Sequence, residues 1–164
     1  MPRLFVRNAD KAGCYFITLT VSHWYYIFDR HNRWQILADS VRYCQKNKGI
    51  KVYSYVFMLN HLHMIVQGDD VSGFLRDFKS FTAQAILKNI GQYEPTILKL
   101  FQTEQGQNFW KEGNHPVLLE SEKFFTQKLH YIHDNPVRKG YVSEVHHWKW
   151  SSAHPNSEIV IDEY

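Results

Sequence analysis

Runs of β-branched and aromatic residues predict the strands of this chain. Residues 15–22 alternate between two faces in the way expected of a half-buried strand. The two faces carry Phe16, Thr18 and Thr20 on one side and Ile17, Leu19 and Val21 on the other. Residues 52–66 form a longer run of the same kind, which favours a pleated sheet. Asn60 marks a bulge or a tight connection that would divide this run into two paired strands.

Apolar residues at helical spacing predict two helices before residue 91. The first covers residues 32–48, with Asn32 as its N-cap and Gly49 as its stop. After a turn at residues 68–70, Ser72 is the expected cap of the second helix. Its predicted buried stripe comprises Phe74, Phe78, Phe81 and Ala85. Residues 91–106 are expected to form a loop with short helical pieces, and an extended segment follows.

A third helix is predicted to begin after Ser121 and to stop at Pro136. Two stripes lie along it at helical spacing. The first faces the core and comprises Phe125, Leu129 and Ile132, and the second comprises Phe124, Lys128, Tyr131 and Asn135. Residues four apart on a helix are neighbours at roughly 5–6 Å. The hydroxyl of Tyr131 and the amide of Asn135 are therefore expected side by side.

The order strand, helix, strand, strand, helix, strand predicts an α+β fold, with helices packed on an antiparallel sheet. The chain has 164 residues, a length that suits one domain with a substantial core. We assign residues 1–152 to that domain. The acidic segment 153–164 is expected to be a poorly ordered tail.

His61 and His63 are the first candidate site residues. Side chains at i and i+2 of a strand leave the same face roughly 6–7 Å apart. Two imidazoles placed in this way can share one metal ion if a third ligand comes from elsewhere. Two ordinary histidines at the surface or core edge give the same pattern, so the pair needs support. The hydroxyl and amide on the third helix offer that support.

Two motifs together resemble a known family. Asn-His-Leu-His at residues 60–63 is followed about seventy residues later by Tyr-Ile-His-Asp-Asn-Pro-Val-Arg-Lys-Gly at residues 131–140. This combination resembles the single-tyrosine HUH transposases (IS200-like), most of all their REP-associated branch. Residues 109–116 and 150–153 agree with the same family. The chain departs from it at Leu59, where proline is common, and at Asn135, where many relatives carry glutamine.

The resemblance implies a ferredoxin-like, RRM-like core and a DNA strand-transfer enzyme. Tyr131 would be the nucleophile and would form a covalent 5′-phosphotyrosine with single-stranded DNA, typically beside a hairpin. A divalent ion, Mg²⁺ or Mn²⁺, would be held by His61, His63 and Asn135. The ligand types by themselves also leave zinc open. His133 is close to Tyr131 in sequence but lies off its helix face, so the general base stays open.

Charge adds a weaker indication of a nucleic-acid partner. The net charge of +3 permits DNA binding without demonstrating it. Candidate phosphate contacts are Arg76, Lys79, Lys128, Arg138 and Lys139. Trp110 and Trp148 could stack on unpaired bases or could equally belong to the core.

The cysteines and the apolar runs indicate the compartment of the protein. Cys14 and Cys44 lack metal or disulfide spacing, and no run is apolar enough for a signal peptide or membrane span, so we expect a cytoplasmic protein. Two other functions remain open: a metal-dependent hydrolase that uses water, and a non-catalytic nucleic-acid-binding module. A homodimer is also left open.

Overall fold

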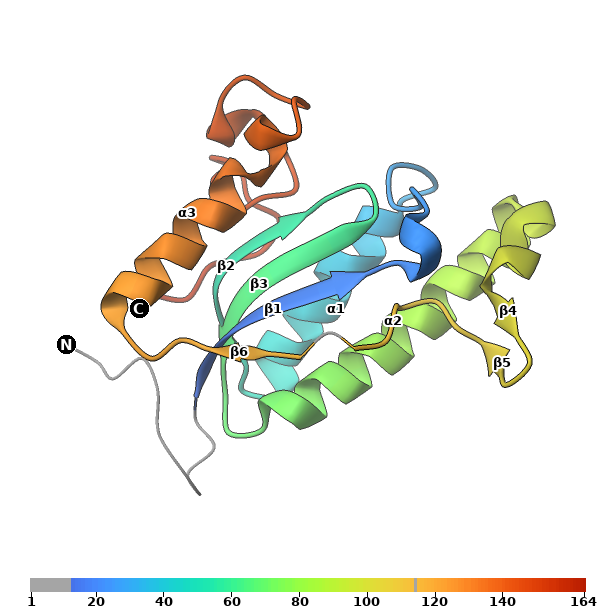
Figure 1. Cartoon of the computed structure of the whole chain (residues 1–164), viewed down its shortest axis with the longest axis horizontal. Helices are drawn as coiled ribbons and strands as arrows, with labels where there is room; N and C mark the ends of the chain where they lie inside the picture. The colour runs from blue at the N-terminus through green and yellow to red at the C-terminus, as the bar shows by residue number, and fades with distance from the viewer. Residues whose placement is uncertain (1–12, 114) are drawn as a thin grey trace.

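The computed structural model describes residues 13–113 and 115–164 and shows a sheet with helices on both faces (Figure 1). In chain order the elements are β1 (Cys14–Thr20), η2 (Ser22–Trp24), α1 (Arg33–Asn47), β2 (Lys51–Phe57), β3 (His61–Gln67), α2 (Val71–Tyr93), η3 (Pro95–Phe101), β4 (Gln102–Thr103), β5 (Gly106–Gln107), β6 (Val117–Leu118), α3 (Glu122–Arg138) and η4 (Val145–His147). No helix within these two ranges has the length and apolar character needed to cross a membrane.

The main sheet has the order β2-β3-β1-β6, and its strand pairs are antiparallel. The predicted division of the long run at Asn60 is confirmed, because β2 ends at Phe57 and β3 begins at His61. In the β1–β3 register, Thr18 lies opposite His63 and Thr20 lies opposite His61. The two histidines therefore lie at the start of β3, the strand between β1 and β2.

Each face of the sheet is covered by different helices. Figure 1 shows α1 and α2 behind the sheet and α3 in front of it. Ile17 and Met64 belong to the core on the α1–α2 side, whereas Phe16 and Ile65 pack with Phe125 of α3. The alternation seen in the sequence thus separates two cores, one on each side. The predicted α+β fold class is confirmed.

The C-terminal segment is packed against the edge of β2, contrary to the expectation of a poorly ordered tail. The Phe57 amide donates to the Trp150 carbonyl at 2.8 Å, and Ile159 is fully buried. The Asp162 carboxylate accepts a hydrogen bond from the Val52 amide at 2.8 Å. The acidic composition gave no sign of this packing, because backbone groups make much of the contact: the Ser152 amide donates to the Tyr55 carbonyl at 3.0 Å and the Asp162 amide to the Val52 carbonyl at 2.9 Å.

Of the two predicted N-caps of α1 and α2, the first is at the expected residue and the second is wrong. Asn32 is the N-cap residue of α1, but its backbone is left-handed (φ 59°) and its side chain makes no cap hydrogen bond. α2 is capped by Asp70, whose side chain accepts from the Gly73 amide at 2.9 Å. Ser72 lies inside that helix, since the chain is already helical from Val71. A cap depends on where the backbone turns, and two capping residues only two positions apart, Asp70 and Ser72, leave that point ambiguous in the sequence.

The buried stripe of α2 follows a different row from the predicted one. Phe74 and Phe78 are buried as expected, but Phe81 is 62% exposed. The buried positions continue instead at Ile86 and Ile90. These residues belong to an i, i+4 row, which drifts around the helix as it crosses the core obliquely. The helix also runs on through Gly91 to Tyr93 before the irregular segment begins.

α3 begins as predicted but ends later. The Ser121 hydroxyl accepts from the Phe124 amide at 3.0 Å, which confirms the cap. Pro136 lies inside the helix, which continues to Arg138. Proline removes one amide donor, yet its fixed φ is compatible with a helix, so the last turn persists. The Lys139 amide still donates to the Asn135 carbonyl at 3.0 Å.

Replacing the two serines tests the cap assignments. Ser121→Ala is expected to lower the free energy of unfolding by about 1 kcal/mol, because an amide of the first turn loses its acceptor. Ser72→Ala is expected to change it by less than about 0.5 kcal/mol, since Asp70 holds the cap of α2. Urea denaturation of both variants measures the difference. Equal losses would contradict the assignment.

Candidate active site

The two histidines of β3 lie on the face of the sheet that α3 covers. Their ring centroids are 4.9 Å apart, and His63 is buried at 5% exposure. His61 donates from Nδ1 to the Asn60 side-chain oxygen at 2.7 Å, and His63 Nδ1 shares a 2.8 Å hydrogen bond with the Thr18 hydroxyl. Because Nδ1 is engaged in both rings, Nε2 is the nitrogen that each could offer to a metal ion.

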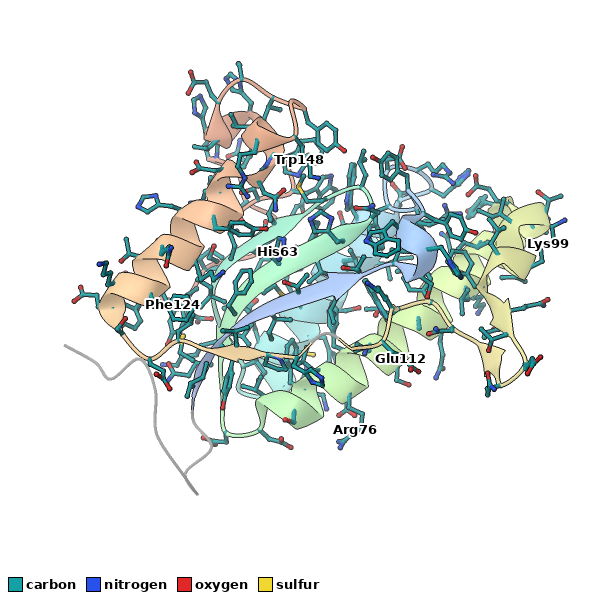
Figure 2. The ribbon with its side chains drawn as sticks, viewed as in Figure 1. His63, Arg76, Lys99, Glu112, Phe124 and Trp148 are labelled. Atoms are coloured by element: carbon teal, nitrogen blue, oxygen red, sulfur yellow. The ribbon has the colours of Figure 1, made fainter. Side chains whose placement is uncertain are left out.

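The phenol of Tyr131 packs against the same pair. Its ring centroid lies 5.3 Å from that of His63, with the planes at 75°. Phe16 of β1 stacks on His63 at 5.2 Å and meets the Tyr131 ring edge-on at 5.9 Å. Tyr131 is nevertheless 40% exposed, so a ligand can approach it from solvent. Figure 2 shows His63 on the sheet, on the side where α3 lies.

Asn135 follows Tyr131 by one turn of α3 and is only 3% exposed. Within residues 13–113 and 115–164, no three His, Cys, Asp or Glu side chains form a group that could hold a metal ion. A third protein ligand beside the two imidazoles would come from another residue type. The side-chain oxygen of Asn135 is a candidate, because an amide oxygen is an acceptor that can bind a divalent cation.

Both histidines are neutral at physiological pH. Burial, together with the charge of Lys139, lowers the pKa of His61 to about 4. Burial lowers the pKa of His63 to about 3, with His61, Lys128 and Arg138 adding to the effect. Metal ions bind the neutral imidazole, so these shifts favour ligation at pH 7.

The same shifts predict how stability depends on pH in the metal-free protein. The folded pKa values lie below the ordinary value of 6.5, so the unfolded chain takes up protons first as the pH falls. Stability is then unaffected above pH 7 and decreases as the pH falls from about 6.5, down to about 4 for His61 and about 3 for His63, by at most ~1.4 kcal/mol per pH unit for each histidine. Urea denaturation at pH 7 and 5 should show a smaller decrease in the double variant His61→Gln/His63→Gln. An identical decrease would refute this prediction.

Three of the five predicted phosphate contacts lie near the candidate site, two beside Tyr131 and one near His61. The Arg138 guanidinium lies 4.3 Å from the centre of the Tyr131 ring, and its Nη2 donates to the Tyr131 carbonyl at 3.2 Å. The Lys128 ammonium lies 5.2 Å from the same ring and 4.6 Å from that of Phe16. Lys139 is close enough to His61 to lower its pKa. These charges could receive the phosphates of a bound strand.

The other two predicted contacts lie elsewhere. Arg76 and Lys79 belong to α2, on the opposite side of the sheet from Tyr131. Figure 2 shows Arg76 projecting from α2 away from His63, and its guanidinium contacts Asp77 at 3.3 Å. The structure therefore does not bring these two residues to the site. Charge along a helix predicts exposure, but it does not say which face of a sheet that helix will cover.

The tryptophans and His133 have structural contacts. Trp110 is buried at 3% exposure and donates its indole N–H to Thr82 at 3.0 Å, and Trp148 donates to the Phe57 carbonyl at 2.9 Å. His133 Nε2 lies 2.7 Å from the Ser152 hydroxyl, which ties α3 to the C-terminal segment. Such contacts favour packing roles for all three residues.

Sequence reasoning did not single out Phe16 and Thr18 as parts of the site. Both stand on the same face of β1, and the strand register places them beside His63. The alternation of residues 15–22 contained this signal. It could be used only once the pairing of β1 with β3 was known.

Comparison with known proteins places this geometry in a family. The family model described as "Transposase IS200 like" matches residues 14–135, which include the histidine pair and the tyrosine. The chain belongs to the IS200-like transposase family. Among relatives of this IS200-like transposase is the REP-associated tyrosine transposase of Escherichia coli (strain K12). It is 25% identical over 144 residues, covering 80% of this chain and 76% of the relative.

Further relatives agree with this assignment. A putative REP-associated tyrosine transposase of Haemophilus influenzae is 23% identical over 155 residues, covering 90% of this chain and 84% of that protein. Among solved structures, a REP-associated tyrosine transposase bound to a REP hairpin has the same fold, with a TM-score of 0.69 and 20% identity. The match covers 94% of this chain and 84% of that one. A putative transposase from Deinococcus radiodurans gives a TM-score of 0.50 at 14% identity, covering 80% and 95%.

Proposed function

We propose that this IS200-like transposase cleaves and rejoins single-stranded DNA through a covalent 5′-phosphotyrosine on Tyr131. The observation that carries the proposal is the 5.3 Å separation between the ring centroids of Tyr131 and His63 within one chain. A nucleophile and a pair of metal-binding side chains from distant parts of the sequence converge at one place. Since one chain supplies both, catalysis in cis needs no exchange of helices between two copies.

The reaction transfers the phosphoryl group of the DNA backbone to Tyr131 and needs no external source of energy. The phenolic oxygen of Tyr131 attacks the scissile phosphorus and loses its proton, while the bond to the 3′ oxygen breaks and that oxygen gains a proton. The products are a tyrosyl 5′-phosphodiester and a free 3′-hydroxyl. Because the ester bond is conserved, a second 3′-hydroxyl can attack the phosphotyrosine and release Tyr131. Cleavage and joining are therefore the same reaction in opposite directions.

The residues around Tyr131 suit this chemistry. A divalent cation, Mg²⁺ or Mn²⁺, held by His61, His63 and Asn135 would polarise the scissile phosphate and neutralise charge on its oxygens. Phe16 and Arg138 pack on the ring of Tyr131 and limit its orientations. Lys128 adds positive charge on the same side.

The DNA substrate is inferred from a relative. One REP-associated tyrosine transposase has been solved with a REP hairpin, and its fold matches this chain over most of both lengths. We extend hairpin recognition to this protein, with the cleavage site in the unpaired strand beside the hairpin.

The proposal is tested with end-labelled single strands that carry a hairpin and an unpaired flank. Incubation with Mn²⁺ followed by denaturing electrophoresis should give a labelled protein–DNA adduct. Cleavage without an adduct would favour a hydrolase that uses water. Binding without cleavage would favour a nucleic-acid-binding module. Either result would overturn the phosphotyrosine mechanism.

A further inference from the structure

An exposed aromatic segment follows β1, next to the histidine pair. Trp24 and Tyr26 are 58% and 55% exposed. His23 and Trp24 adopt left-handed backbone conformations with φ of 58° and 57°. Bulky residues rarely adopt such angles, which cost energy and persist where the surroundings impose them. The fold thus retains a strained turn that presents large apolar side chains to solvent.

Asn60 connects this segment to the candidate metal ligands. Its side-chain amide donates to the Trp24 carbonyl at 3.1 Å, and its side-chain oxygen accepts from His61 Nδ1 at 2.7 Å. The Val21 amide also donates to the Asn60 carbonyl at 2.8 Å. One residue therefore fixes both the orientation of His61 and the position of the aromatic segment.

Basic and aromatic side chains extend the exposed surface. The Lys111 ammonium lies 4.2 Å from the centre of the Trp24 ring. The side chain of Tyr26 interacts with that of Tyr141, which is 38% exposed and follows the C-terminal end of α3. Tyr141 also stacks on Trp148 with 5.6 Å between ring centroids. Aromatic faces and positive charge thus lie together on the segments that border His61 and α3.

We propose that Trp24, Tyr26 and Tyr141 form a stacking surface for the unpaired bases that flank the scissile phosphate. This inference rests on the proposed function and adds a binding subsite to it. Exposed aromatic rings interleaved with cations are the usual means of holding single-stranded nucleic acid, because every base has a face that can stack and the cations contact the backbone. The occupant is a single strand, since both faces of a base inside a duplex are already covered by the neighbouring base pairs.

The test measures binding without requiring catalysis. Two hairpins are compared, one blunt and one with an unpaired flank that contains 2-aminopurine, in the absence of metal and on a Tyr131→Phe background. Trp24→Ala and Tyr26→Ala are each expected to weaken binding of the flanked hairpin about 5- to 100-fold and to reduce quenching of the 2-aminopurine. Binding of the blunt hairpin should stay within about twofold. Trp24→Phe, which keeps a stacking face, should retain most of the affinity.

Tyr43→Ala and Phe81→Ala are matched controls. These residues are 60% and 62% exposed, on α1 and α2 behind the sheet, and their replacement should leave both hairpins bound as before. Equal weakening for blunt and flanked hairpins by Trp24→Ala, or no weakening for either, would overturn the stacking surface. Failure of the phosphotyrosine mechanism would appear separately, as absence of an adduct when the protein with Tyr131 intact is incubated with Mn²⁺, while the flank-dependent binding persists.

Discussion

Replacing Tyr131 with phenylalanine is expected to abolish the covalent protein–DNA adduct, with cleavage reduced at least about a thousandfold. The variant lacks only the hydroxyl that attacks phosphorus. Its ring can still pack against Phe16, His63 and Arg138 as the tyrosine does. Stability and DNA affinity should therefore stay close to those of the wild type. Adduct formation on denaturing gels, thermal unfolding and hairpin binding measure the three properties.

Tyr43→Phe provides the matched control, because it removes the hydroxyl of an exposed tyrosine on α1. It should form adduct at the wild-type rate. An adduct that survives in Tyr131→Phe would show that another residue is the nucleophile. Cleavage that continues without an adduct would show that water attacks the phosphate and that Tyr131 only orients the strand.

Replacing His61 with alanine is expected to reduce cleavage at least about a hundredfold and to leave hairpin binding within about threefold. The imidazole would contribute to the metal site, where its loss costs tenfold or more in affinity and removes stabilisation of charge in the transition state. A chelator should have the same effect on the wild-type protein. His61 is the better test position, because His63 is buried, stacks on Phe16 and bonds to Thr18. Removing the His63 side chain would therefore lower the stability of the fold as well.

His115→Ala is the control, since this histidine is exposed and lies outside the site. It should cleave normally. Equal loss of binding and cleavage in His61→Ala would contradict a purely catalytic metal site. Full activity in the presence of a chelator would contradict a metal requirement altogether.

Local signals in the sequence predict how the residues of the candidate site are arranged within their own strand or helix. Period-two alternation put His61 and His63 on one face, and helical spacing put Tyr131 one turn before Asn135. The structure places the Tyr131 ring beside His63, a proximity that neither local signal predicts by itself. The resemblance to HUH transposases supplied the chemical roles, which composition and spacing alone do not contain.

Features that depend on tertiary packing were predicted less well. Arg76 and Lys79 have the charge of phosphate contacts, but α2 covers the wrong face of the sheet. Phe81 has the hydrophobicity of a core residue but is exposed, because the buried positions of α2 follow the i, i+4 row from Phe74 to Ile90. The polar C-terminal segment was assigned no structure, yet Asp162 bonds to the edge of β2. Each of these three errors concerns how a segment packs against residues that are far away in the sequence.

Peptide mapping of the trapped adduct tests the convergence of tyrosine and histidines most directly. The wild-type protein is incubated with a flanked hairpin and Mn²⁺, then digested with protease and nuclease and analysed by mass spectrometry. We predict one modified peptide, carrying nucleotide through a 5′-phosphodiester on Tyr131, and no such peptide from His61→Ala. A nucleotide attached to any other residue, or an adduct that forms equally well in His61→Ala, would contradict the account.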